Sequence, residues 1–124
     1  MSADAREILD ALQAAIDGRD PDILNALFEE RSVLIGTAGD GRSPDARRRY
    51  LDAVAQGEPF RWDWQEIVSF HESDDTLGFA AFGALVVSGD EGEQCYPMRA
   101  TVLSVQTPDG WRLRHFNGSV PPIS

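Results

Sequence analysis

The stretch that decides the fold is QCYPMRATVLSVQTPDGWRLRHFNGSVP, residues 94–121. It holds two runs with the side-chain pattern of strands, separated by the turn sequence Thr107-Pro108-Asp109-Gly110. Such a pattern predicts two antiparallel strands joined by a hairpin. Arg99, His115 and Asn117, the most chemically capable side chains of this region, lie along these strands. We therefore expect the two strands to carry both the main sheet and the site.

Two more strand-like segments precede this hairpin. Residues 60–71, FRWDWQEIVSFH, alternate bulky and polar side chains, whereas residues 76–88, TLGFAAFGALVVS, are nearly continuously apolar. The continuous apolar run predicts a strand that is buried on both faces. Turn-forming residues at 72–75 and 89–92 complete the pattern of a four-stranded antiparallel meander.

The first half of the chain has mostly helical patterns. Apolar residues recur at helical spacing in residues 2–17. Two signals that combine a capping residue with a proline, Asp20-Pro21 and Ser43-Pro44, predict helices that run to about residue 30 and about residue 56. Between them, SVLIGT, residues 32–37, predicts one short strand.

The third predicted helix carries three consecutive arginines, Arg47, Arg48 and Arg49. On an acidic chain, the simplest interpretation of such a run is a solvated face. Tyr50 and Leu51 are then expected to turn inward.

The charge balance excludes several classes of partner. The net charge is −10, and all 11 basic residues are arginine. An acidic surface repels phosphate backbones and anionic lipid heads, so we expect neither nucleic acid nor membranes as partners. The absence of lysine also excludes Schiff-base chemistry and the lysine of phosphate-binding loops.

The sequence predicts no metal and no cofactor. Cys95 is the single cysteine, and the two histidines, His71 and His115, lie on different predicted strands without metal-ligand spacing. The glycines of residues 36–41 do not form a dinucleotide fingerprint, because no suitable helix follows. Charged residues interrupt the first segment, and no apolar run approaches the roughly 20 residues of a membrane span. We expect a cytoplasmic protein.

Helices followed by a meander predict an α+β fold. Residues 1–124 fit one domain, in which a curved antiparallel sheet covers its apolar face with the N-terminal helices. A long twisted sheet that curls around helices forms a cone. A cone that its own side chains do not fill leaves a pocket.

Two strings carry a resemblance to a known family. These are AIDGRDPDILNALFEERSVLIGT, residues 15–37, and RATVLSVQTPDGWRLRHFNGSVP, residues 99–121. Together with the order of elements, they resemble the nuclear transport factor 2-like superfamily, and within it the SnoaL-like group of polyketide cyclases and relatives of ketosteroid isomerase. The resemblance covers essentially the whole chain and implies a cystatin-like cone. It is specific for fold rather than function, because this architecture hosts isomerases, cyclases, dehydratases, binding modules and oligomerisation domains.

The resemblance does not carry over the isomerase chemistry. That enzyme uses a tyrosine, an aspartate base and a protonated aspartate, and the matching positions here are Leu12, Gly36 and Arg99. None of these residue types performs the corresponding proton transfer. The sequence therefore argues against steroid-type isomerisation.

The candidate polar site is the trio Arg99, His115 and Asn117. If the family orientation holds, all three point into the cone. Arg99 is then a clamp for a carboxylate or enolate, or else the partner of a buried acid such as Glu66 or Asp63. His115 is a general acid or base whose tautomer Asn117 fixes, or else a structural histidine.

An aromatic wall is the second candidate feature. Trp62 and Trp64 share a face of their predicted strand and, with Tyr50, could bind a planar apolar ligand. Whether that face is concave or convex stays open at this stage.

The other sheet face is expected to form a two-fold homodimer, as the resemblance also implies. Alternation assigns to it Tyr96, Met98, Val102, Arg114 and Phe116. Two functions remain. One is a pocket for a small hydrophobic or carboxylate ligand, either with acid/base catalysis as an isomerase, cyclase or hydrolase of a hydrophobic carbonyl compound, or without it. The other is a non-catalytic association module with a vestigial pocket.

Overall fold

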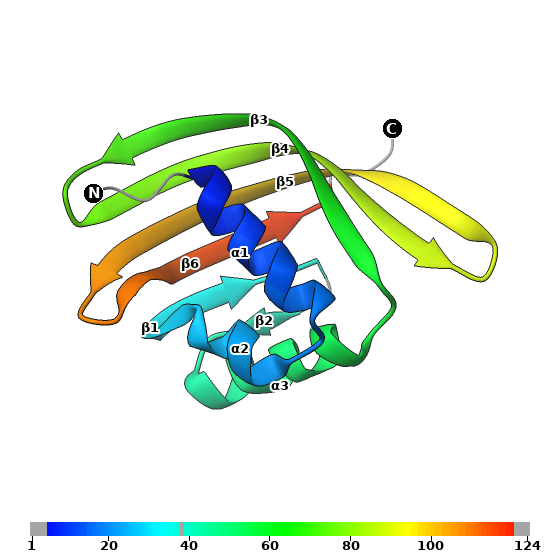
Figure 1. Ribbon diagram of the computed structural model, residues 1–124, viewed down its shortest axis with the longest axis horizontal. Coiled ribbons are helices and arrows are strands. Elements are labelled where there is room, and N and C mark those ends of the chain that lie inside the picture. Colours follow the sequence, from blue (N-terminus) through cyan, green and yellow to red (C-terminus); the bar gives the residue numbers. More distant parts are fainter. Residues whose placement is uncertain (1–4, 38, 121–124) are drawn as a thin grey trace.

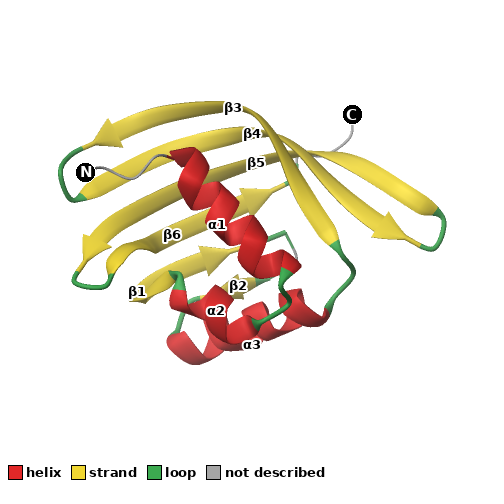
Figure 2. Ribbon diagram, in the orientation of Figure 1, coloured by secondary structure: helices red, strands yellow, loops and turns green. Residues whose placement is uncertain are grey.

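Three helices lie against one face of a curved six-stranded sheet (Figures 1 and 2). The structure is a computed structural model and describes residues 5–37 and 39–120. Its elements, in order, are α1 (Ala5–Asp17), α2 (Pro21–Ala26), β1 (Phe28–Ile35), β2 (Asp40–Gly41), α3 (Pro44–Gln56), β3 (Phe60–Glu72), β4 (Thr76–Gly89), β5 (Gly92–Thr107) and β6 (Gly110–Ser119). The expected α+β class, with a curved sheet around N-terminal helices, is confirmed.

The sheet order is β2-β1-β6-β5-β4-β3. Strands β3 to β6 form the predicted antiparallel meander, and β1 adds to β6 as a parallel neighbour. This parallel pair places the N-terminal strand beside the C-terminal one. The short hairpin partner β2 then closes this edge of the sheet.

Both cap-then-proline signals mark true helix starts. The carboxylate of Asp20 accepts from the backbone N–H of Asp22 at 2.9 Å, and the hydroxyl of Ser43 accepts from the N–H of Ala46 at 3.1 Å. These bonds satisfy N–H groups that the first helical turn leaves without partners.

The second helix ends earlier than expected, at Ala26 rather than near residue 30. The backbone N–H of Leu113 donates to the carbonyl of Leu27 at 2.8 Å, and Phe28 already pairs with Leu113. Pairing with β6 therefore competes with the helix and wins, which extends β1 toward the N-terminus. Local propensity alone does not register such a distant partner.

The solvated-face interpretation of the arginine run is wrong for Arg47, which is only 5% exposed. Its guanidinium donates to Ser32 Oγ at 2.8 Å, to Asn25 Oδ1 at 3.2 Å and to the Glu30 carbonyl at 3.4 Å. Burial lowers the pKa of this guanidinium, and the nearby carboxylates of Glu29 and Glu30 offset part of that effect. Arg47 thus ties α3 to α2 and β1.

The two sheet faces differ sharply. Phe79, Val102 and Phe116 form a row across β4, β5 and β6 that faces the helices, with exposed fractions of 0%, 0% and 5%. Phe82, on the other face of β4, is 42% exposed. The expectation that β4 is buried on both faces is therefore wrong, because the helices lie on one side of the sheet (Figure 1).

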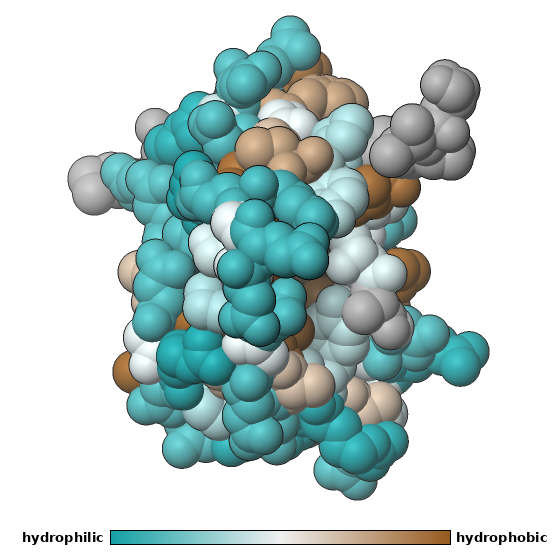
Figure 3. Space-filling view, turned by 90° about the vertical axis from the view of Figure 1, so that its right-hand side faces the viewer, coloured by the Kyte–Doolittle hydropathy of each residue, from teal (hydrophilic) through white to brown (hydrophobic). Residues whose placement is uncertain are grey.

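Hydrophilic residues cover most of the side that lies at the right of Figure 1, and hydrophobic residues appear there in small separate areas (Figure 3). Within the described residues, no helix is long and apolar enough to cross a membrane.

Candidate functional site

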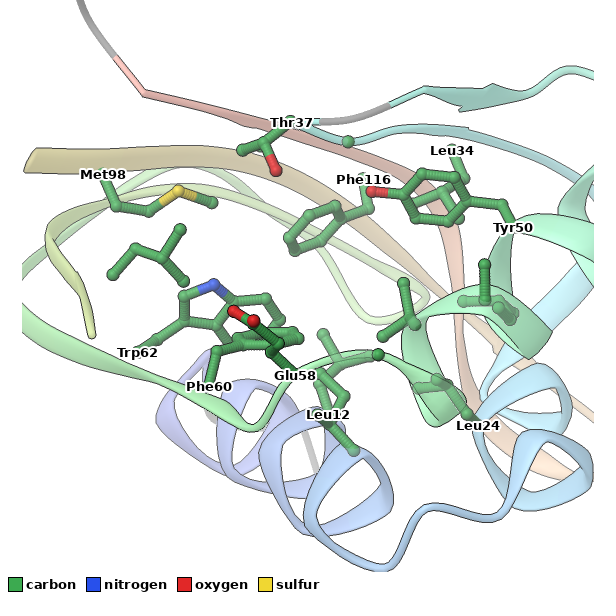
Figure 4. A pocket seen from close by; sticks show the side chains of 18 of the residues that line it. Leu12, Leu24, Leu34, Thr37, Tyr50, Glu58, Phe60, Trp62, Met98 and Phe116 are labelled. Carbon is green, nitrogen blue, oxygen red and sulfur yellow. The ribbon is translucent and has the colours of Figure 1, made fainter. Parts of the chain in front are cut away.

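A cavity of about 390 Å³ lies between the helices and the concave face of the sheet (Figure 4). Every helix and all strands except β2 contribute to its wall. The lining residues are Leu12, Ile16, Leu24, Phe28, Leu34, Gly36, Thr37, Tyr50, Leu51, Ala53, Val54, Gly57, Glu58, Phe60, Trp62, Leu85, Val87, Met98, Phe116 and Gly118. The volume lies within the range of small-molecule sites, which are predominantly apolar with few polar groups.

Few polar side chains reach this cavity. Among residues 5–37 and 39–120 they are those of Thr37, Tyr50, Glu58 and Trp62, and no lysine, arginine or histidine of these residues lines the cavity. The Tyr50 ring packs against Gly36, where an added Cβ would overlap the phenol oxygen. A side chain at residue 36 would therefore displace Tyr50 from the wall.

An aromatic cluster forms one wall. The Trp62 ring lies 5.7 Å, centroid to centroid, from each of the Phe60, Trp64 and Phe116 rings. Gln13 of α1 ties the start of this wall to the helices, since its Oε1 accepts from the backbone N–H of Trp62 at 2.8 Å and its Nε2 donates to the Phe60 carbonyl at 3.2 Å. The cluster is thus held at both its ring and its backbone atoms.

The predicted trio lies on the outer sheet face, so the expectation that it points into the cone is wrong. Across β5 and β6, Arg99 pairs with Ser119, Thr101 with Asn117, and Leu103 with His115. Their neighbours in sequence face the cavity instead: Met98, Phe116 and Gly118 line it. Arg99, Asn117 and His115 therefore share a face but lie in successive rows rather than around one point.

A β-bulge lies in β6 between Leu113 and His115. The register between β5 and β6 shifts between Leu103 and Ser104, so that Leu103 pairs with His115 but Ser104 pairs with Leu113. The extra residue on β6 changes the phase of alternation. Leu113 is consequently buried at 2% exposure, although strict alternation would group it with His115.

Arg99 and His115 each form a hydrogen bond with a residue of a neighbouring strand. Arg99 is exposed, and its Nε donates to Ser119 Oγ at 3.1 Å. Among residues 5–37 and 39–120, no ion pair joins it to Glu66 or Asp63. His115 Nδ1 lies 3.0 Å from the Val33 carbonyl, and it is the donor because a carbonyl only accepts. This bond matches the structural alternative for His115.

The aromatic residues lie on the concave side. Tyr50 lines the cavity, as expected for a ligand-contacting residue, and Trp64 is buried behind Trp62 at 8% exposure. Trp62 rather than Trp64 lines the wall. Trp62 and Trp64 therefore lie on the concave face of the sheet, while their role in ligand binding stays a prediction.

Two of the three positions matched to the isomerase, Leu12 and Gly36, line the cavity, and Arg99 lies outside it. Neither of the two inward positions carries a group that transfers protons. A smaller hollow of about 220 Å³ lies between the start of α1 and the β5–β6 hairpin. Across the part of the chain that the structure describes, no three His, Cys, Asp or Glu side chains gather as a metal-ligand set.

Met98, Phe116, Leu85 and Val87 line the cavity, although the sequence did not predict them as site residues. A usable signal was present, because Met98, Ala100 and Val102 form the more apolar face of β5. In a sheet covered by helices on one side, the apolar face turns toward the helices.

Comparison with known proteins supports the same architecture. The sequence pattern of the SnoaL-like domain matches residues 5–124. A search of curated proteins finds no significant match.

Among solved structures, a protein from Xanthomonas campestris, provisionally assigned as a calcium/calmodulin-dependent protein kinase II association domain, has a TM-score of 0.85 at 17% identity, over 99% of this chain and 91% of that one. A provisionally assigned dehydratase of the nuclear transport factor 2-like family from Streptomyces avermitilis has a TM-score of 0.82 at 14% identity, over 95% and 94%. A provisionally assigned scytalone dehydratase from Novosphingobium aromaticivorans has a TM-score of 0.76 at 11% identity, over 96% and 86%. These likenesses are evidence of fold. Because the family pattern covers nearly the whole chain, the chain belongs to the SnoaL-like domain family.

Proposed function

We propose that this protein binds a small, largely apolar molecule in the cavity beneath its helices. The observation that carries the proposal is the cavity itself, about 390 Å³ of space with an almost wholly apolar wall. Native interiors are packed with few voids larger than a water molecule. A cavity of this size is therefore better explained as a ligand site than as a packing defect.

Of the two kinds of ligand expected from the sequence, a hydrophobic molecule is favoured over a carboxylate. No cationic side chain of the described part of the chain lines the cavity, and the carboxylate of Glu58, which does, would repel an anion. Arg99, the expected carboxylate clamp, lies on the opposite face of the sheet. A bound carboxylate would lose its hydration without gaining an ion pair.

Binding without catalysis is the form of the proposal that the wall supports best. Acid/base turnover of a carbonyl compound needs a group that accepts or donates a proton beside the ligand. Among the lining residues, Tyr50 and Glu58 are the ones with ionisable side chains. An isomerase, cyclase or hydrolase activity would have to use these two rather than His115.

Val54→Trp tests the proposed site. Val54 is a half-buried lining residue of α3, and a bulky ring there occupies the hollow. Calorimetric titration with 2-acetylnaphthalene should show binding by the unaltered protein and at least about tenfold weaker binding by the variant, which corresponds to about 1.4 kcal/mol. Ala14→Trp adds the same ring on the exposed side of α1 and should bind normally. Equal binding by both variants would place the ligand elsewhere.

A second function, self-association, is favoured by the outer sheet face. The expectation that Met98, Val102 and Phe116 belong to the dimer face is wrong, because these side chains are buried in the core. Instead Phe82, Val68 and Phe70 are 42%, 46% and 60% exposed. We propose a two-fold homodimer through this outer face, with Arg99 beside Phe82 at its rim.

Phe82→Arg should disrupt that dimer. The substitution removes an exposed aromatic ring and places a second cation opposite Arg99, the cross-strand neighbour of Phe82. Sedimentation at micromolar concentration should give twice the monomer mass of 13.6 kDa for the unaltered protein and the monomer mass for the variant. Ile23→Arg, at a 57% exposed position on α2, is the matched control and should leave the dimer intact. An unaltered protein that sediments as a monomer would refute the association.

A further inference from the structure

The residues that the structure describes leave one indole N–H at the cavity wall without a hydrogen-bond partner. Nε1 of Trp62 is buried, and no acceptor within residues 5–37 and 39–120 bonds to it. A buried donor left in this state costs about 1–3 kcal/mol. Trp62 also lines the cavity, so a ligand there contacts the side chain that carries this donor.

The Trp62 ring is not free to turn toward water. Three rings pack around it at 5.7 Å, namely those of Phe60, Trp64 and Phe116, and Gln13 holds its backbone N–H at 2.8 Å. Figure 4 shows the indole nitrogen on the side of the ring that faces Met98. Met98 is an unbranched thioether, a side chain that adapts its shape to a neighbour at low cost. Since Met98 and Trp62 both line the cavity, a shift of this thioether gives an acceptor on a bound molecule room to reach the indole nitrogen.

The charges around the cavity select the kind of acceptor. The lining, as far as the structure describes the chain, has no cationic side chain and includes the carboxylate of Glu58, and the whole chain carries a net charge of −10. A neutral acceptor, such as a carbonyl oxygen, bonds to an indole N–H without bringing a charge into this apolar space. A carboxylate oxygen would bring one that nothing at the wall compensates.

We propose that Trp62 Nε1 is the recognition donor of the site, and that its ligand is a neutral apolar molecule with a carbonyl oxygen at this position. The inference rests on the proposed ligand-binding function and adds the polar group that the ligand carries. An apolar wall selects ligands by their size and shape, whereas a buried donor discriminates between ligands with and without a hydrogen-bond acceptor.

Two nearly isosteric probes test the inference. They are 2-acetylnaphthalene, which carries a ketone, and 2-isopropenylnaphthalene, in which a methylene group replaces the ketone oxygen. Calorimetric titration of both probes against the unaltered protein, Trp62→Phe and Trp64→Phe forms a double-mutant cycle. Trp64 is the matched control, because its Nε1 is also buried without a partner in the described residues, but its side chain does not line the cavity.

Trp62→Phe should weaken binding of the ketone by about five- to tenfold more than binding of the hydrocarbon, as expected for one lost hydrogen bond. Trp64→Phe should change the two affinities by equal factors. In two-dimensional nitrogen–proton spectra, the Trp62 indole proton should move downfield with the ketone and not with the hydrocarbon. Equal losses for both probes in Trp62→Phe, with no downfield shift, would overturn the inference while leaving the proposed function in place. Binding of neither probe to the unaltered protein would overturn the proposed function and the inference together.

Discussion

Replacing Arg47 by alanine should lower the free energy of unfolding by about 3–4 kcal/mol. Three acceptors would lose their donor, namely Ser32 Oγ, Asn25 Oδ1 and the Glu30 carbonyl. Ser32 is itself only 3% exposed, so water does not readily replace the guanidinium there. The emptied volume adds a cavity cost. Urea unfolding followed by circular dichroism measures the change.

Arg48→Ala is the matched control for this experiment. Arg48 is the next residue of α3, and its ion pairs with Asp22 at 2.6 Å and Asp52 at 3.0 Å are solvent-exposed, with 41% of its side-chain surface accessible. Exposed ion pairs contribute little to stability, because solvent screens the charges and two long side chains lose freedom when they pair. Equal losses for Arg47→Ala and Arg48→Ala would mean that the buried hydrogen bonds do not distinguish the two arginines.

Gly83→Ala should cost about 3 kcal/mol, at the upper end for an overpacked site. A Cβ at this position would overlap the backbone carbonyl of Asp63 and lie 2.8 Å from Trp64 Cα. Backbone atoms cannot rotate away as a side chain can, so β3 and β4 would have to separate. They meet here beside the bulge between Trp64 and Glu66.

The damage from Gly83→Ala should extend to the ligand site. Strand β3 carries Trp62, so a shift of β3 moves the aromatic wall of the cavity. We expect weaker binding of 2-acetylnaphthalene together with a lower midpoint of thermal unfolding. Gly89→Ala is the control in the same strand, because its Cβ would meet nothing nearer than 4.0 Å. If Gly83→Ala were as stable as Gly89→Ala, the close approach of the two backbones would be disproved.

The two proposed functions use opposite faces of one sheet. The ligand cavity lies on the concave side with Trp62 and Met98, whereas the association surface lies on the outer side with Phe82 and Arg99. Substitutions on the outer face should therefore change mass without changing ligand affinity. The variants Phe82→Arg and Val54→Trp separate the two properties.

The helices and hairpins could be predicted because their signals are local. A cap at Asp20 or Ser43 bonds to an N–H two or three residues away. Gly92 and Gly110 adopt the positive φ that their hairpin turns require. The end of α2 could not be predicted in the same way. It depends on Leu113, which lies far along the chain from its partner Leu27.

The sequence predicted the candidate site on the wrong face of the sheet. Alternation along β5 correctly separated Arg99 and Thr101 from Met98 and Val102, since successive side chains of a strand point to opposite sides. Alternation does not tell which of the two faces meets the helices, however, and the family resemblance implied the face of Arg99. The apolar character of Met98 and Val102 was the better guide.

The sequence by itself determined the order of the main elements, the starts of the second and third helices, the meander and the division of β5 into two faces, because these follow from contacts within a few residues and from side-chain periodicity. Tertiary structure alone decided which face encloses the cavity, where the β5–β6 bulge changes the phase at His115, and that Arg47 is buried. Each of these depends on atoms supplied by distant segments, such as the acceptors 15 to 22 residues from Arg47. Only the folded chain brings those atoms together.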